Sequence, residues 1–268
     1  MLTTNGFDSM FITRELLPMC SREWFIVKKD IMYEILKAKF VQCQPYRKLL
    51  LAYADMVFIE DTTNDYWGRG RDGNGNNHLG RLHNALASET KTFAIVGDSN
   101  ARHLSEQLVH CAGVLGVMVE CRTYCIPGAS IKDIDVHMSN FQDFDAVFLI
   151  VGSNDIQRKD GTPKTEINTL IEQLTELKQS FKAICQNTYL IPLLPRNTGT
   201  HLQDYSTVKT YNKLAKYTNR HLPIDLSLPE FWKRDKVNTD FLLADGVHLN
   251  IDARDLLCTK MLNIFLGM

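Results

Sequence analysis

The sequence predicts an α/β fold from about residue 91 onward, preceded by a small, mainly helical module. Short apolar runs alternate with helical patterns in this part of the chain, which is typical of parallel strands joined by right-handed helical crossovers. Turn-forming polar residues follow directly after the apolar runs, as expected where buried parallel strands end. We therefore expect a three-layer α/β/α sandwich around a five-stranded parallel sheet in roughly 2-1-3-4-5 order.

Five apolar runs are the expected strands, namely Phe93–Val96, Val117–Val119, Ala146–Val151, Tyr189–Leu194 and Leu222–Leu226. Two helices are expected between them, over Asn100–Leu115 and Glu166–Cys185, because apolar residues recur there at spacings of three and four. A last helix is expected over Ile251–Leu266.

The first part of the chain shows helical patterns and loops without strong strand patterns. One helix is expected within Trp24–Cys43, where an imperfect apolar stripe lies opposite lysines. The stripe consists of Ile31, Ile35, Leu36, Ala38 and Phe40. A second helical segment, Tyr46–Tyr53, follows Pro45, which suits the first turn of a helix. The boundary with the α/β part is expected at Ala87 to Lys91, so the expected domains are residues 1–90 and 91–268.

Composition and charge narrow the class of protein. A hydrophobic content of 44% over 268 residues is enough to fill the core of a globular protein. The 30 basic residues balance 31 acidic ones, and the net charge of −1 removes nucleic acid as an expected partner. The amino-terminal sequence lacks a basic leader with an apolar segment, and no long apolar run is found. We therefore expect a soluble, cytoplasmic protein.

The 7 cysteines are odd in number and spread through predicted helices and strands. This pattern favours free thiols in a reducing compartment. Cys121 and Cys125 lie close together, but no second pair and no histidine at ligand spacing completes a zinc site. The sequence therefore implies no metal and no other cofactor.

A serine follows the first predicted strand of the α/β part. The strand Phe93–Val96 leads into Gly97, Asp98, Ser99 and Asn100, so Ser99 is expected at the carboxyl edge of the sheet, where ligands collect. A serine hydroxyl becomes an effective nucleophile only with a base that takes its proton and donors that stabilise the developing oxyanion. Ser99 is therefore a candidate nucleophile whose partners must come from elsewhere in the chain.

Two further strand ends offer candidate oxyanion donors. Asn154, which follows the third predicted strand, has a neutral side-chain amide that can point into the crevice. Gly128, which follows the second, has a backbone N–H that no Cβ shields. Each segment taken alone is also consistent with an ordinary turn.

A histidine and an aspartate before the last helix supply a candidate base. Asp245 precedes His248 by three residues, so its carboxylate can accept from Nδ1–H while Nε2 faces a hydroxyl. Three other aspartates compete for the orienting role but lack this spacing after an apolar lead-in: Asp235, Asp240 and Asp252. Three other histidines fall in predicted helices and are expected to be surface or packing residues: His103, His110 and His137.

Taken together, the segments around Ser99, Gly128, Asn154 and His248 resemble the four blocks of the SGNH hydrolase family, also called GDSL-like lipases and esterases. The resemblance covers residues 91–268 and implies Ser99 as nucleophile, His248 as base and Asp245 as the residue that orients it. It also implies an oxyanion hole from the Ser99 and Gly128 N–H groups and the Asn154 side chain. Asn100 stands where the family's name-giving motif has leucine, as in its acylesterase-like members.

A glycine- and asparagine-rich stretch, residues 62–80, favours turns, yet it contains Asp65, Tyr66 and Trp67. A carboxylate and two large aromatics are unusual in a solvated linker. Together with the pattern of Trp24–Phe40, this stretch resembles the carboxyl-terminal part of the NADAR family, similar to its riboflavin-intermediate N-glycosidases, over residues 22–86.

The NADAR resemblance implies cleavage of an N-glycosidic bond in a ribosylated base, with Asp65 and Trp67 at pocket positions. The family's amino-terminal portion, which carries an acidic residue of the site, has no counterpart in the first twenty residues here. Residues 1–90 are therefore expected to form a partial NADAR-like module, and a catalytic, a binding and a vestigial role all stay open.

The sequence thus predicts a serine esterase that hydrolyses an acyl ester of a small-molecule or carbohydrate-like alcohol, with an O-acetyl ester as one candidate. Two alternatives remain. One is an N-glycosidase that acts on a ribosylated base or ADP-ribose-type substrate through residues 1–90, and the other is a non-catalytic binding protein. The oligomeric state is open.

Overall fold

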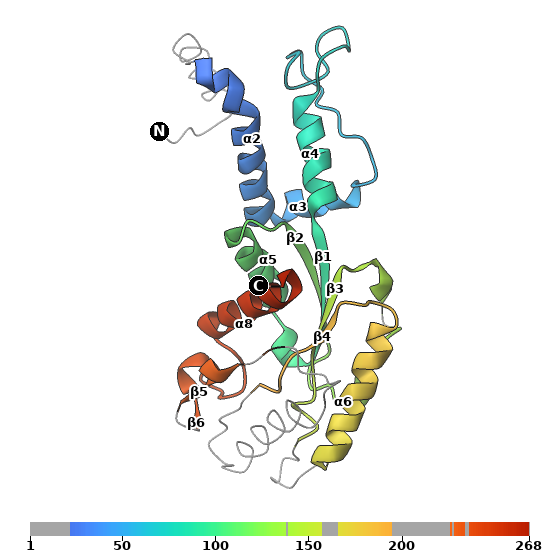
Figure 1. The fold of residues 1–268 in the computed structure, drawn as a ribbon, viewed down its shortest axis with the longest axis vertical. Helices are drawn as coiled ribbons and strands as arrows, with labels where there is room; N and C mark the ends of the chain where they lie inside the picture. Colours follow the sequence, from blue (N-terminus) through green and yellow to red (C-terminus); the bar gives the residue numbers. More distant parts are fainter. Residues whose placement is uncertain are drawn as a thin grey trace. The chain divides into compact units, whose positions relative to one another are not determined.

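The computed structural model describes residues 22–137, 139–156, 166–194, 226, 228–233 and 236–267. The chain divides into two compact units, Met1–Glu89 and Thr90–Met268. The described residues of the first unit form helices and a long loop, whereas the second unit contains a parallel sheet and its covering helices (Figure 1).

The first unit contains the helices α2 (Arg22–Gln42), α3 (Gln44–Ala52) and α4 (His78–Glu89). Pro45 lies in the first turn of α3, as expected, where its missing N–H is not needed. Arg47 is fully buried, and its guanidinium donates to the carbonyl oxygens of Phe40 (3.1 Å) and Val41 (3.3 Å). Because the last carbonyls of a helix lack intrahelical donors, Arg47 joins the end of α2 to α3.

The apolar stripe predicted on α2 is only partly buried. Leu36 and Phe40 are buried, but Ile31 and Ile35 are exposed by 41% and 54% and Ala38 is exposed as well, so the expected stripe is wrong at these three positions. Four further large side chains of this helix are exposed: Trp24, Phe25, Ile26 and Val27. The reason is that α3 and α4, the described helices in contact with α2, cover only part of its surface.

The second unit contains a four-stranded parallel sheet in the order β2-β1-β3-β4. Its strands are β1 (Lys91–Gly97), β2 (Val119–Cys125), β3 (Ala146–Ile150) and β4 (Thr188–Leu190). The predicted order of these four strands is confirmed. The expected fifth strand, 222–226, lies outside the described residues except for Leu226, which is not in a strand.

Strand β2 begins at Val119, where the predicted strand ended. The strand forms one edge of the described sheet and carries Glu120, Arg122 and Thr123, which are at least partly exposed. An edge strand therefore lacks the unbroken apolar run by which buried strands are recognised. The later bounds of β2 place its end at Cys125, which pairs with Gly97 at the end of β1, directly before Ser99.

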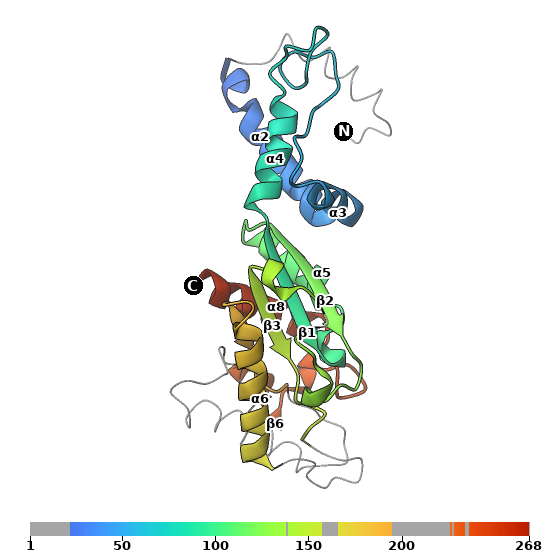
Figure 2. The same cartoon turned by 90° about the vertical axis from the view of Figure 1, so that its right-hand side faces the viewer.

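Helices cover both faces of the sheet (Figures 1 and 2). On one face α5 (Leu104–Val114) and α8 (Ile251–Leu266) pack against Phe93, Ile95 and Phe148. On the other face α6 (Ile167–Lys182) packs against Val96 and Leu149. Side chains alternate between the two faces along each strand, so the strand residues divide between two hydrophobic clusters. The predicted three-layer α/β/α sandwich is confirmed.

Short elements complete the described part of the second unit. A hairpin that the sequence did not indicate is formed by β5 (Trp232–Lys233) and β6 (Lys236–Val237). Single turns of 3₁₀-helix occur at η2 (Ser99–Ala101), η3 (Ile131–Asp133), η4 (Phe141–Asp143), η5 (Pro229–Phe231) and η6 (Thr239–Phe241).

The helix expected from Asn100 begins only at Leu104. His103 precedes it with φ 65°, in the left-handed region, and His137 lies in a turn, so the prediction of helical positions for these two histidines is wrong. The reason is the separate 3₁₀ turn at Ser99, after which the chain must change direction before α5 starts. His110 lies in α5 as expected and is exposed.

Among the helices within the described ranges, none is both long enough and apolar enough to cross a lipid bilayer.

Candidate active site

Ser99 lies in a sharp turn directly after β1. Gly97, the last residue of β1, lies so close to β3 that a Cβ there would collide with the carbonyl of Ile150. The buried Asp98 donates its backbone N–H to the same carbonyl at 3.0 Å, and its carboxylate accepts from the N–H of Asn100 at 2.9 Å. Asp98 thereby caps the 3₁₀ turn, which leaves Ser99 half-buried at the edge of the sheet.

The loops after β2 and β3 are tied to this turn. The N–H of Ile126 donates to the Gly97 carbonyl at 2.9 Å, and the Asn154 amide donates to the Ala129 carbonyl at 2.9 Å. The same amide lies 3.5 Å from the Asp98 carboxylate. Gly128 has φ 77°, a conformation that glycine adopts readily. The strand ends therefore bring the segments of Ser99, Gly128 and Asn154 to one region.

His248 and Asp245 form a close pair on the loop before α8. Nδ1 of His248 lies 2.6 Å from Oδ2 of Asp245, while the other carboxylate oxygen accepts from the backbone N–H groups of Val247 (2.8 Å) and His248 (3.0 Å). The hydrogen bond with the His248 ring is the largest cause that lowers the pKa of Asp245 to about 2. An ionised carboxylate only accepts hydrogen bonds, so Nδ1 carries a proton, and in the neutral form of the ring the lone pair is at Nε2.

The other candidate aspartates are placed differently. Asp240 forms an ion pair with Lys233, and Asp252 is exposed in the first turn of α8. Asp235 lies outside the described residues. Within the part of the chain that the structure describes, Asp245 is therefore the carboxylate that contacts His248.

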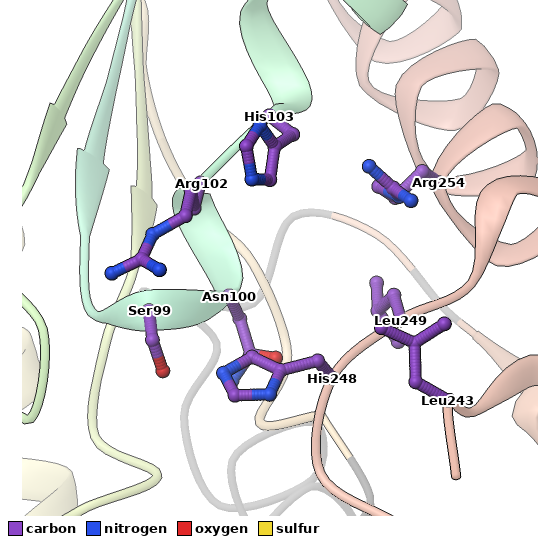
Figure 3. A pocket seen from close by; sticks show the side chains of 8 residues that line it. All are labelled: Ser99, Asn100, Arg102, His103, Leu243, His248, Leu249 and Arg254. Carbon is purple, nitrogen blue, oxygen red and sulfur yellow. The ribbon is translucent and has the colours of Figure 1, made fainter. Parts of the chain in front are cut away.

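Ser99 and His248 line one pocket, together with Asn100, Arg102, His103, Leu243, Leu249 and Arg254 (Figure 3). Asp245 is outside the lining and reaches it through His248. Gly128 and Asn154 are also outside the lining. The pocket thus lies on the His248 side of Ser99.

Four polar lining residues were not assigned to the site from the sequence: Asn100, Arg102, His103 and Arg254. Arg254 is in the first turn of α8, and its Nε donates to the Asn250 carbonyl at 3.2 Å. Asn100, Arg102 and His103 follow shortly after Ser99 in the chain, whereas Arg254 joins them only because α8 packs against α5.

Asn100 is 4% exposed, and both polar atoms of its amide lack a hydrogen-bond partner among the described residues. A buried amide without partners costs on the order of 1–3 kcal/mol. Such groups in native structures are often found at functional sites.

In the first unit, Asp65 and Trp67 lie in the loop between α3 and α4. The Asn64 side chain accepts from the N–H groups of Tyr66 (2.9 Å) and Trp67 (3.0 Å), which shapes this loop. Asp65 is exposed and Trp67 half-buried.

The aromatic residue between them is held by contacts with other segments. The ammonium group of Lys28 on α2 lies 3.5 Å from the ring centroid of Tyr66, and the ring of His78 on α4 lies 4.4 Å from it. The loop therefore packs against α2 and α4 rather than extending as a linker.

No group of His, Cys, Asp and Glu that could hold a metal ion is found in the residues that the structure describes.

Residues 8–89 match the family model described as "NADAR domain". N-glycosidase YbiA of Escherichia coli (strain K12) is 47% identical over 62 residues, which cover 23% of this chain and 39% of the relative. Riboflavin biosynthesis protein PYRR of Arabidopsis thaliana is 38% identical over 77 residues, which cover 28% of this chain and 13% of the relative. The predicted resemblance is confirmed, and the match extends to residue 8, beyond the predicted bounds of 22–86. The chain spans about two fifths of the length of the N-glycosidases that it matches.

Solved structures similar to this chain include a lipase/acylhydrolase from Enterococcus faecalis, with a TM-score of 0.52 and 18% identity over 66% of this chain and 96% of that chain. The acetylxylan esterase Axe2 from Geobacillus stearothermophilus has a TM-score of 0.51 and 14% identity over 66% of this chain and 94% of that chain. At these identities the similarity establishes the fold alone. The chain shares the α/β fold of these lipase and esterase structures, so the predicted fold class is confirmed.

Proposed function

We propose that residues 91–268 form a serine esterase domain with Ser99 as nucleophile, His248 as base and Asp245 as the residue that orients the base. The observation that carries the proposal is the hydrogen bond between His248 Nδ1 and Asp245 at 2.6 Å, in a ring that lines the same pocket as Ser99. This bond leaves the basic Nε2 for the Ser99 hydroxyl. The fold of the lipase and esterase structures supports the same assignment.

The reaction proceeds in two steps, acylation of Ser99 and hydrolysis of the acyl-enzyme. In the first, His248 Nε2 takes the hydroxyl proton as Ser99 Oγ bonds to the ester carbonyl carbon, and the C–O bond to the alcohol then breaks as that proton passes to the departing oxygen. In the second, His248 takes a proton from water, the water oxygen bonds to the acyl carbon, and the carboxylic acid leaves as the proton returns to Ser99. General acid–base catalysis of this kind contributes on the order of 10²–10⁴-fold.

The oxyanion formed in each step is stabilised by the N–H groups of Ser99 and Gly128 and by the Asn154 side-chain amide. One N–H of the Asn154 amide donates to Ala129 and, with the Ile126 bond, holds these loops beside the Ser99 turn. The other N–H, whose contact with Asp98 is long at 3.5 Å, is the proposed donor to the oxyanion. Donors fixed before reaction stabilise the charge without reorganisation, so Asn154→Ala is expected to lower kcat on the order of 10²–10³-fold.

The acyl group of the substrate is small, and an acetyl group is the first choice. Axe2, which shares the fold, is an acetylxylan esterase, and this supports an O-acyl ester of a carbohydrate-like or other small alcohol.

The esterase proposal is tested by labelling the full chain with a fluorophosphonate and mapping the modified peptide. We expect modification of Ser99 and a burst of acyl-enzyme formation with a short-chain aryl ester, both lost in Ser99→Ala. Ser105→Ala, a neighbouring serine in the first turn of α5, is the matched control and should keep both. Label found elsewhere, or a burst that survives in Ser99→Ala, would refute the nucleophile.

A second activity is favoured by the 47% identity to N-glycosidase YbiA. In this proposal residues 1–90 form a partial NADAR-like domain that cleaves an N-glycosidic bond of a ribosylated base or an ADP-ribose-type substrate, with Asp65 and Trp67 at the reacting sugar. Such cleavage needs a carboxylate or similar group to stabilise an oxocarbenium-like transition state.

The two activities are separated by three variants of the full chain. Release of free base should survive Ser99→Ala, disappear in Asp65→Ala and survive in the control Asp55→Ala, which replaces another exposed aspartate. Absence of base release together with unlabelled Ser99 would favour a non-catalytic binding protein over both activities.

A further inference from the structure

Among the residues that the structure describes, the pocket beside Ser99 is lined by three basic side chains and by no acidic one. Arg102, His103 and Arg254 share its wall with Ser99 and His248, while the other described lining residues are neutral. The Asp245 carboxylate is bonded to His248 and lies outside the lining. The pocket therefore carries two permanent positive charges.

Neither arginine is neutralised by a carboxylate within the described ranges of the chain. Arg254 donates from Nε to a backbone carbonyl, and Arg102 is exposed. Two guanidinium groups near a nucleophile provide planar, forked donors that match the oxygen atoms of phosphate or carboxylate groups.

The third basic residue is held in an unfavourable backbone conformation. His103 has φ 65°, a left-handed conformation that is strained for a residue with a Cβ. In Figure 3 its ring and the Arg254 side chain point toward the same space, from the start of α5 and from α8. Strain of this kind is retained where the position of a side chain matters for function.

Asn100 adds a second observation, independent of charge. Its side chain lines the pocket, is almost completely buried and has no hydrogen-bond partner among the described residues for either amide atom. An amide that lines the same pocket as two arginines can donate to a bound oxyanion or accept from a hydroxyl group.

The side of Ser99 on which the pocket lies identifies the part of the substrate that fills it. Gly128 and Asn154, the proposed donors to the acyl oxygen, are outside the lining, whereas His248 is within it. In the proposed mechanism His248 returns its proton to the departing alcohol. The alcohol, rather than the acyl group, therefore occupies the basic pocket.

We infer that the alcohol portion of the ester carries an anionic phosphate or carboxylate group, which Arg102 and Arg254 bind with the help of His103. This inference rests on the proposed esterase function of the same site. The substrate class is thus an acyl ester of a phosphorylated or carboxylated alcohol.

Three acetyl esters built on one three-carbon skeleton test this inference: acetylglycerol, acetylglycerol 3-phosphate and acetylglycerate. Acetate release by the full chain gives kcat/KM for each. We expect at least one anionic ester to exceed neutral acetylglycerol by about tenfold or more, since hydrogen bonds to charged groups are the stronger kind. The anionic ester with the higher kcat/KM shows whether the pocket prefers a phosphate or a carboxylate group.

Variants that remove one positive charge test which side chains cause the preference for an anionic ester. Arg102→Gln and Arg254→Gln should each lower the ratio of kcat/KM for the preferred anionic ester to that for acetylglycerol, by about tenfold. Lys182→Gln removes the same charge from the exposed last turn of α6 and should leave this ratio unchanged.

A ratio near one in the unmodified protein, with Ser99 still labelled by the fluorophosphonate, would overturn the inference and leave the esterase proposal standing. Loss of both labelling and acetate release would overturn both. If Ser99 is labelled but none of the three esters is hydrolysed, the rate of labelling is measured with each alcohol added. Glycerol 3-phosphate or glycerate must then slow the labelling of Ser99 more than glycerol does. Equal slowing by all three alcohols overturns the inference.

Discussion

The imidazole of His248 and the carboxylate of Asp245 are joined at 2.6 Å although only two residues lie between them in the chain, and the same carboxylate also accepts from the backbone N–H of His248. One side chain thus holds both the ring and the backbone of the histidine. Gly246 between them has φ 67°, which allows the chain to turn this tightly. The orientation of the proposed base is therefore a property of this loop.

Acidification should lower the free energy of unfolding because of Asp245. The pKa of this residue is lowered to about 2, chiefly by the hydrogen bond with the His248 side chain, whereas the pKa of an aspartate in an unfolded chain is about 3.9. The folded state thus favours the carboxylate, so the stabilisation is complete above about pH 4 and is lost as the pH falls toward 2.

This pH effect is measured by urea unfolding at pH 4 and pH 2. Asp245→Asn should reduce the difference between the two free energies of unfolding, because the variant has no carboxyl to titrate at this position. An identical difference in the variant would contradict the assignment of this stabilisation to Asp245.

Gly97→Ala should disturb the Ser99 turn, because a Cβ at this position would collide with the backbone of Ile150 on the neighbouring strand. We expect a loss of about 1–3 kcal/mol in the free energy of unfolding and slower labelling of Ser99 by a fluorophosphonate.

Gly116→Ala is the matched control for this variant. Gly116 has φ 75° and no atom within contact distance of an added Cβ, so alanine should cost about 1–2 kcal/mol while the labelling of Ser99 stays unchanged. Equal labelling rates in the two variants would show that the close approach of β1 and β3 does not position the serine.

Asn100→Leu should stabilise the protein. The substitution removes two buried amide atoms that have no hydrogen-bond partner in the described part of the chain, and leucine is the residue of the name-giving motif at this position. An increase of about 1–3 kcal/mol in the free energy of unfolding is expected by chemical denaturation. Asn100→Asp should have the opposite effect and lower the free energy of unfolding, since it buries a charge. Destabilisation by leucine would mean that the amide is satisfied in solution.

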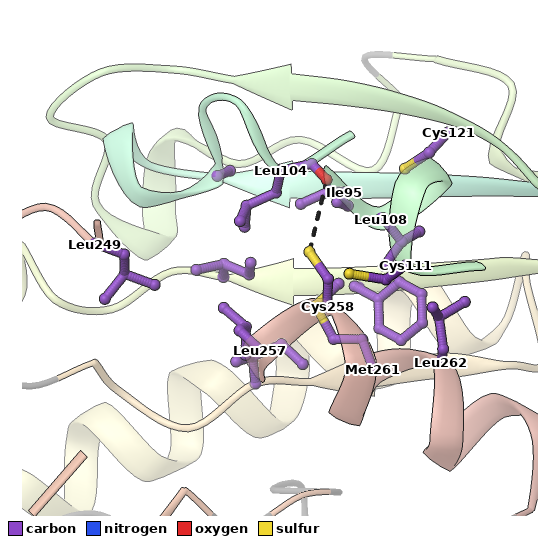
Figure 4. Packing of buried hydrophobic residues seen from close by; sticks show 14 of the residues in the cluster. Ile95, Leu104, Leu108, Cys111, Cys121, Leu249, Leu257, Cys258, Met261 and Leu262 are labelled. Atoms are coloured by element: carbon purple, nitrogen blue, oxygen red, sulfur yellow. Dashed lines mark hydrogen bonds between the residues drawn. The ribbon is translucent and has the colours of Figure 1, made fainter. Parts of the chain in front are cut away.

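The described cysteines should differ widely in reactivity. Burial raises the pKa of Cys258 well above its usual range and also raises that of Cys111, and Figure 4 shows both among the hydrophobic side chains between the sheet and α8. Cys43 and Cys125 are only half-buried. Because the thiolate is the reactive form, a maleimide at pH 8 should modify Cys43 and Cys125 first. Mass spectrometry of the native protein checks this order, and equally fast modification of Cys258 would contradict it.

Much of the sheet was predictable because its strands are buried on both faces. The runs Phe93–Val96 and Ala146–Val151 are continuous and apolar, and both are strands in the structure. The predicted bounds were wrong at β2, an edge strand on which Glu120 and Arg122 are at least partly exposed. The burial expected for α2 was also wrong, because an apolar stripe predicts a helix without saying how much of it neighbouring elements will cover.

Local pattern alone was enough to place Ser99 after a strand and to pair Asp245 with His248, since both relationships depend on a few consecutive residues. The remaining composition of the pocket depended on packing. Arg102 and His103 precede α5, Arg254 lies on α8, and these helices are joined by contacts such as that between Cys258 and Leu104, 154 residues apart in the chain. No periodicity records which polar residues such distant segments will present to one another, because their approach is driven by apolar faces that do not specify their polar neighbours. The sequence therefore indicated a candidate nucleophile and base, whereas the basic wall beside them was decided by the docking of two helices on one face of the sheet.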